Sequence, residues 1–114
     1  MTAETLQAAE QLASQGVSAE VIDVATIKPL DTDTILESVG KTGRCVIVHE
    51  APLSGGWGAE IAACLADRGL MSLLAPVKRV TGYDTVMPLY RLEEIYMPST
   101  ERIINTALEA MAYQ

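Results

Sequence analysis

The feature that most constrains the fold is a near-continuous apolar run followed by a glycine-rich turn. Residues 44–50 have the sequence R-C-V-I-V-H-E, and S-G-G-W-G follows a few residues later, before a second apolar stretch. A short run of this kind, rich in valine and isoleucine and bounded by turn residues, is typical of a strand buried on both faces. Such strands form parallel sheets that helices cover, so the run predicts an α/β protein.

Helical and strand-like patterns alternate along the rest of the chain. Helical spacing of apolar residues predicts helices at 2–15, with Thr2 as a possible N-cap, and at 59–69. Another helix is predicted to begin at the cap Asp31 and to be closed by Gly40 and Gly43. A short helical turn is predicted at 89–96, and a last helix begins after Pro98 and Ser99 and runs to the end. Strands are predicted at 19–27, 44–50 and 76–81. These elements predict a three-layer α/β/α sandwich with a mostly parallel sheet, in a single domain over 1–114.

The predicted sheet is thin. Sheets usually carry about four to six strands, and a chain of this class that opens on a helix is unusual. The pattern therefore indicates that part of the sheet lies outside these residues.

Charge and hydropathy argue against several partners. Eight lysines and arginines stand against fifteen aspartates and glutamates, for a net charge of −7. Such a surface repels phosphate backbones, so we expect no nucleic-acid binding. No apolar run approaches the roughly 18 residues of a membrane span, and the N-terminus does not resemble a signal peptide. Cys45 and Cys64 form no metal-binding pattern, and we expect buried free thiols in a reduced, cytoplasmic location.

The glycine-rich turn does not match a dinucleotide-binding fingerprint. Ile61 stands where the third glycine or alanine belongs, Trp57 lies between the first two glycines, and Glu60 adds negative charge. A tight turn with close helix–strand packing is the favoured interpretation. A free-standing nucleotide- or ligand-binding regulatory module that uses residues 55–58 remains the alternative.

His49 is the one histidine and ends a predicted strand beside Glu50. A histidine there could act as a general base, but no G-x-S-x-G or H-E-x-x-H pattern accompanies it. We therefore predict no catalytic residue, and a contact role for His49. Asp84 follows the last strand and is predicted to cap its own turn.

Tyrosine and methionine side chains gather in the C-terminal third. Tyr90, Tyr96 and Met97 lie near the short helix, and Tyr113 lies near the end of the chain. Such side chains suit a partner surface, but they could equally cover the ends of the sheet, and the sequence leaves both alternatives open.

Four stretches in one order resemble a known family. They are G-V-S-A-E-V-I-D-V-A-T-I-K-P-L-D, V-I-V-H-E-A-P with G-G-W-G-A-E-I-A-A, R-V-T-G-Y-D-T-V-M-P, and Y-M-P-S-T-E-R-I. Together they resemble the C-terminal domain of transketolase-like enzymes. More narrowly, they are similar to the beta subunit of the decarboxylating component of 2-oxo acid dehydrogenase complexes, of the pyruvate, 2-oxoisovalerate or acetoin type. The C-terminal domain of another transketolase-like synthase is the remaining alternative.

The resemblance implies a heterotetramer of alpha and beta subunits that uses thiamine diphosphate and magnesium. Its parent reaction is oxidative decarboxylation of a 2-oxo acid with acyl transfer to lipoyl groups. The C-terminal domain of beta pairs with a second beta subunit and helps to dock the dihydrolipoyl acyltransferase core. Because the pyrimidine-binding domain of beta is absent here, the resemblance implies no catalytic, cofactor-binding or metal residue in this chain, which alone should be inactive.

The resemblance also implies two further strands upstream, one of them between the strands at 19–27 and 44–50. Met1 would then match an internal methionine, and the chain would be a fragment or carry a misplaced start. We expect the isolated chain to be marginally stable or strand-swapped, and direct pairing of 19–27 with 44–50 would contradict this. The residues expected at domain or subunit contacts are His49, Glu50, Trp57, Tyr83, Asp84, Met87 and Tyr113.

Overall fold

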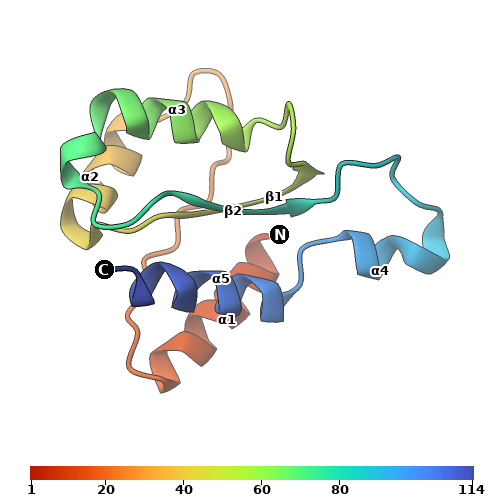
Figure 1. Cartoon of the computed structure of the whole chain (residues 1–114). Coiled ribbons are helices and arrows are strands. Elements are labelled where there is room, and N and C mark those ends of the chain that lie inside the picture. The colour runs from red at the N-terminus through yellow and green to blue at the C-terminus, as the bar shows by residue number, and fades with distance from the viewer.

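The computed structural model describes every residue from Met1 to Gln114 and places helices on both faces of a short parallel sheet (Figure 1). The helices are α1 (Thr2–Ser14), α2 (Thr32–Thr42), α3 (Gly58–Arg68), α4 (Glu93–Tyr96) and α5 (Thr100–Ala112), with 3₁₀ turns η1 (Leu70–Ser72) and η2 (Tyr90–Leu92). The strands are β1 (Val46–Pro52) and β2 (Lys78–Gly82). The predicted α/β class is confirmed. None of the helices has the length and apolarity needed to cross a membrane.

Local capping chemistry sets both ends of α2 and the start of α5. The Asp31 carboxylate accepts a hydrogen bond from the Thr34 N–H at 3.2 Å, as predicted for the start of α2. Gly43 ends that helix with a φ of 73°, and Ser99 caps α5 by accepting from the Arg102 N–H at 3.1 Å. The N-cap assigned to Thr2 is wrong. Thr2 is already helical, and the residue before it, in the cap position, makes no side-chain cap.

The apolar strand lies between two cores, as its composition predicts. β1 and β2 run parallel, with Val46 opposite Lys78 and Val48 opposite Val80. Val46 and Val48 pack against the core under α1 and α5, whereas Ile47 belongs to the core under α2 and α3 (Figure 1). The buried members of the first core are Ala8, Leu12, Val80, Ile103 and Ile104. Those of the second are Ile35, Val39, Ile47, Ile61 and Leu65.

The strand predicted at 19–27 is wrong. These residues form no ladder, and β1 pairs with β2 alone. Between residues 18 and 27 the only backbone hydrogen bond joins the Ala25 N–H to the Asp23 carbonyl, at 3.0 Å. Ile22 still packs against the core under α2 and α3. The apolar pattern therefore placed the segment against the core, but a strand also needs a neighbouring edge with which to pair, and none adjoins it.

Candidate functional site

The turn between β1 and α3 is built around the His49 ring. The His49 Nε2 atom accepts a hydrogen bond from the Gly58 N–H at 3.2 Å. A Cβ atom at Gly56 would lie 2.6 Å from His49 Cε1, and one at Gly58 would lie closer still to Nε2. Gly55 has a φ of 74°, a conformation that favours glycine. The glycines therefore let the start of α3 approach the histidine, which confirms the packing interpretation of the turn.

The His49 ring makes its one hydrogen bond through Nε2. Burial lowers the pKa of its imidazole below 6.5, and the nearby Arg79 charge lowers the pKa further. Because Nε2 is the acceptor, Nδ1 carries the proton, and this buried atom has no hydrogen-bond partner. No hydroxyl, thiol or carboxylate is hydrogen-bonded to the ring. Nearby, Glu50 is exposed and lies 4.0 Å from the N-terminal amine, while Trp57 precedes α3 with 39% of its surface exposed.

Asp84 joins the loops that leave the two strands. Its carboxylate accepts from the Ser54 N–H at 2.9 Å and from the Ser54 hydroxyl at 2.5 Å. The hydroxyl bond is the main reason that the pKa of Asp84 lies below its ordinary value. Arg79 supports the same loop by donating to the Leu53 carbonyl at 2.8 Å. The prediction that Asp84 caps its own turn is wrong, because parallel strands end at one edge and bring Ser54 within reach.

Aromatic packing anchors the chain that follows β2. The Arg102 guanidinium lies 4.9 Å from the centre of the Tyr83 ring and donates to the Thr81 carbonyl at 2.8 Å. Tyr96 is buried and meets Tyr83 edge-on, with ring centres 6.5 Å apart. At Gly82 a Cβ atom would lie 2.5 Å from the Tyr96 ring. These contacts hold both ends of the segment 83–96 against the end of the sheet.

Between those anchors the segment exposes apolar side chains to solvent. We call residues 83–95 the arm; it projects beyond the carboxyl ends of the strands (Figure 1). Val86, Leu89 and Tyr90 are 88%, 89% and 88% exposed, which excludes any part in the core. The other exposed apolar side chains of the arm are Tyr83, Met87, Leu92 and Ile95. A grouped apolar surface of this kind is typical of a protein–protein contact.

The sequence left open whether the aromatic side chains of the C-terminal third form a partner surface or cover the ends of the sheet. Tyr96 covers the end of the sheet, whereas Tyr90 faces solvent, so each alternative holds for one residue. Met97 is half-buried. Tyr113 is 49% exposed beyond α5, at the opposite end of the molecule from the arm (Figure 1).

The residues expected at contacts therefore do not form one site. His49, Glu50 and Trp57 lie at the β1–α3 turn, Tyr83, Asp84 and Met87 lie in the arm, and Tyr113 lies apart. The sequence motifs did not identify Val86, Leu89, Leu92 and Ile95 as contact residues. The signal for them was present, since apolar residues crowd into 86–95 around a proline without the spacing of a long helix.

The two cysteines form no disulfide. Both are free and half-buried, and burial raises the pKa of the Cys45 thiol to about 11. No group of three or more histidine, cysteine, aspartate or glutamate side chains is arranged to hold a metal ion.

Comparison with known proteins identifies the family. The family model "Transketolase, C-terminal domain" matches residues 1–103. The chain is 44% identical over 113 residues to "Pyruvate dehydrogenase E1 component subunit beta" of Staphylococcus epidermidis, which covers 99% of this chain and 35% of that protein. The protein of the same name from Bacillus subtilis is 42% identical, with the same coverage.

A solved structure agrees with these relatives. It is described as "Split gene transketolase, inactive beta4 tetramer" and superposes with a TM-score of 0.83 at 29% identity, covering 98% of this chain and 35% of that one. The chain thus spans 35% of the length of each of these proteins. The resemblance drawn from the sequence motifs is confirmed. The chain belongs to the transketolase C-terminal domain family.

Proposed function

We propose that this chain is the C-terminal assembly domain of the beta subunit of a thiamine-dependent 2-oxo acid dehydrogenase. The parent reaction would be oxidative decarboxylation with acyl transfer to lipoyl groups, and the relatives' name favours pyruvate as the 2-oxo acid. The observation that carries the proposal is the apolar arm, whose most exposed side chains have no partner within the chain. Another transketolase-like synthase is less favoured, since the transketolase structure is 29% identical and the dehydrogenase subunit 44%.

The residues present do not fit the thiamine diphosphate and magnesium of the parent enzyme. A diphosphate needs free N–H groups at a glycine turn, but the Gly58 N–H already bonds to His49, whose ring fills the space beside Gly56. Glu60 in the first turn of α3 would repel the phosphates. The chain also lacks a carboxylate group arranged for a divalent cation. These features likewise weigh against the nucleotide-binding alternative, and we propose that the chain alone is inactive.

The arm suits a contact between beta subunits. Its apolar side chains lie among the charged residues Arg91, Glu93 and Glu94, an arrangement typical of an interface core with a polar rim. A tyrosine side chain that a partner pocket covers is a common anchor of such contacts, and a covered leucine adds buried apolar area. We further propose that the alpha subunit and the dihydrolipoyl acyltransferase core bind other faces of the assembled enzyme.

A pair of substitutions tests the arm. Leu89→Asp places a charge in its centre, and Met71→Asp does the same at η1, where Met71 is 97% exposed at the other end of the molecule (Figure 1). We expect the unmodified chain to self-associate in light scattering. Leu89→Asp should weaken that association by about 30-fold or more, because it places an unpaired charge in a buried apolar contact. Met71→Asp should leave it unchanged.

Two results would contradict the proposal. One is equal weakening by both substitutions, and the other is a chain that stays monomeric at every concentration. Enzymatic inactivity is tested separately, by following decarboxylation of pyruvate by the purified chain with added thiamine diphosphate and magnesium. Detectable turnover would show that the chain holds a catalytic site of its own.

A further inference from the structure

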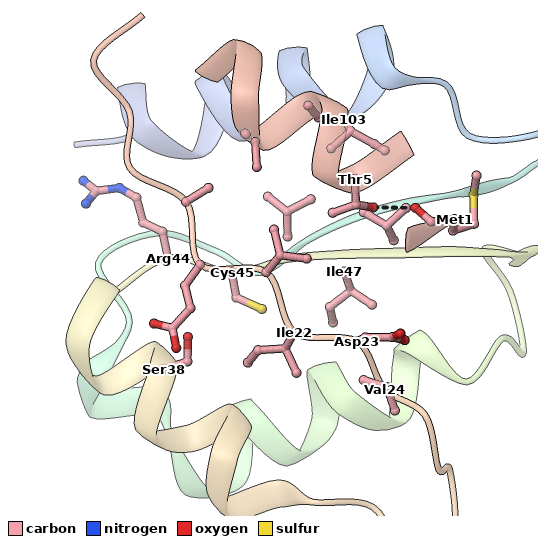
Figure 2. Close-up of a pocket in the computed structure, with 18 of the residues that line it drawn as sticks. Met1, Thr5, Ile22, Asp23, Val24, Ser38, Arg44, Cys45, Ile47 and Ile103 are labelled. Carbon is pink, nitrogen blue, oxygen red and sulfur yellow. Dashed lines mark hydrogen bonds between the residues drawn. The ribbon is translucent and has the colours of Figure 1, made fainter. Parts of the chain in front are cut away.

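The His49 ring is held inside the turn between β1 and α3. Ile47 points from β1 toward α3 (Figure 2), and alternate residues of a strand share a face, so His49 points the same way. There Nε2 accepts from the Gly58 N–H at 3.2 Å. The α-carbon of Gly56 lies against both the ring and the Pro52 carbonyl. The ring therefore fits this place as a neutral acceptor.

A proton on Nε2 would break this arrangement. Nε2 would become a donor that faces another donor, the Gly58 N–H, and the hydrogen bond would be lost. The other ring nitrogen, Nδ1, is buried without an acceptor. The ring also borders an apolar cavity of about 750 Å³ between β1 and residues 17–24 (Figure 2), where a charge would be poorly solvated. A protonated ring is thus favoured only when it leaves the turn for water.

The charged groups on the surrounding elements do not offset that cost. The positive charge of Arg79 on β2 lowers the pKa of the imidazole and opposes a second positive charge beside it. Glu50 on β1 and Glu60 in the first turn of α3 are exposed, and the Glu50 carboxylate lies 4.0 Å from the amine of Met1. The carboxylate of Asp84, after β2, is already hydrogen-bonded in the neighbouring loop. Acidification therefore favours departure of the ring.

Two contacts connect the ring to the loop that holds the arm. The ring lies against Gly56, two residues after Ser54, so its departure frees the backbone there. Arg79 donates to the Leu53 carbonyl at 2.8 Å, on the residue before Ser54, and an imidazolium would repel that guanidinium. Between these contacts Ser54 binds the arm residue Asp84 through its N–H and its hydroxyl. The protonation state of the ring thus reaches the arm by both routes.

We propose that His49 is a pH-sensitive switch that closes the β1–α3 turn and holds the arm when neutral, and that opens the turn and loosens the arm when protonated. The opening is local, because the two cores on either side of β1 keep the rest of the chain folded. The switch depends neither on the proposed enzyme function nor on what the arm binds.

The size of the effect follows from the titration of the open turn. In the open turn the ring meets water and has its ordinary pKa of 6.5, whereas in the closed turn its pKa is lower. Between pH 7.5 and 5.5 the ratio of open to closed turns should therefore rise by up to about tenfold. Asp84 does not titrate in this range, because its pKa lies below 3.8.

Amide hydrogen exchange measured by NMR tests the switch in the purified chain. Rates at the Gly58 and Ser54 N–H groups, corrected for the intrinsic effect of pH, are compared at pH 7.5 and 5.5. We expect the protection of both groups to fall by about five- to tenfold at the lower pH. The control is the Thr34 N–H, which a carboxylate also holds, but beside the opposite end of α3. Its protection should not change.

His49→Gln separates the proton from the hydrogen bond, since glutamine keeps an acceptor for the Gly58 N–H but does not titrate. In this variant the Gly58 and Ser54 amides should be equally protected at both pH values. Chemical shifts of the unmodified chain provide a measurement that needs no variant. The Gly58 and Ser54 amide shifts should titrate together with the imidazole, with a midpoint below pH 6.5.

Four results would overturn the proposal. The first is protection of Gly58 that does not change between the two pH values, or amide shifts that do not follow the imidazole. The second is the same fall in protection in His49→Gln as in the unmodified chain. The third is an equal fall at Thr34, which would indicate general unfolding. The fourth is a response of Gly58 without one at Ser54, which would remove the link to the arm.

Discussion

The close packing of His49 against the glycine turn predicts that one added methyl group will destabilise the chain. In Gly58→Ala the new Cβ atom would overlap the imidazole and lie 3.2 Å from Ile47 Cγ2. Both neighbours belong to β1 and have little room to move, because β1 is held between two cores. The perturbation therefore falls on a rigid contact rather than on a flexible side-chain end.

The expected loss follows from two opposing effects. Alanine in a helix is favoured over glycine by up to about 1 kcal/mol. Overpacking against a fixed neighbour costs about 1–3 kcal/mol. Overpacking should prevail, so we expect Gly58→Ala to lower the free energy of unfolding by ~1–2 kcal/mol. Each kcal/mol corresponds to a fall of about 4–8 °C in melting temperature for a small domain.

The assay is urea denaturation followed by circular dichroism, with Gly40→Ala as the matched control. Gly40 lies within α2, is exposed, and would place its Cβ atom in open space. That substitution should stabilise the chain by about 0.5–1 kcal/mol. In a His49→Ala background the ring is gone, and Gly58→Ala should then cost less than about 0.5 kcal/mol. The reasoning is refuted if the two glycine substitutions act alike, or if removing the ring does not rescue Gly58→Ala.

Three further predictions concern titration. The ionised Asp84 carboxylate stabilises the fold at pH values above its unfolded pKa of about 3.8, and this stabilisation is lost as the pH falls through the lower folded pKa. In Ser54→Ala the free energy of unfolding should therefore fall less steeply as the pH is lowered through this range. An unchanged pH dependence would contradict the contact between Asp84 and Ser54. His49 also has a depressed folded pKa, so its contribution is present above pH 6.5 and lost below it. His49→Gln should remove the fall in stability between pH 7 and 5 measured by thermal melts, whereas an unaltered fall would exclude His49 as its source. The third prediction concerns Cys45 in a Cys64→Ser chain at pH 8. Iodoacetamide should alkylate Cys45 in the folded chain roughly 100-fold more slowly than in the unfolded chain, because a pKa of about 11 leaves little thiolate. Similar rates in the two states would show an accessible thiol.

Local chemistry made much of the fold predictable. Asp31 and Ser99 cap their helices through hydrogen bonds to residues three positions on, a contact that sequence spacing alone specifies. The apolar run at 46–48 indicated burial on both faces, and the two cores on either side of it agree. The glycine turn was likewise interpreted as packing, because Ile61 and Glu60 do not suit a phosphate site.

Contacts between distant segments could not be predicted in the same way. Asp84 meets Ser54 only because two parallel strands end at the same edge. The arm was missed because exposure depends on what the rest of the chain covers, and Leu89 and Tyr96 look equally suited to burial in the sequence. Residues 19–27 have the composition of a strand, but strand formation depends on a partner that local pattern does not reveal.

The sequence by itself thus determined the starts of α2 and α5, the doubly buried strand and the family, since each depends on capping residues, periodicity or motifs in order. Only the tertiary structure decided where Asp84 binds, which aromatic side chains remain exposed, and that 19–27 stays unpaired beside an apolar cavity. The physical reason is that side-chain periodicity records which faces are buried, whereas hydrogen-bond pairing and exposure depend on which distant segments the fold brings together.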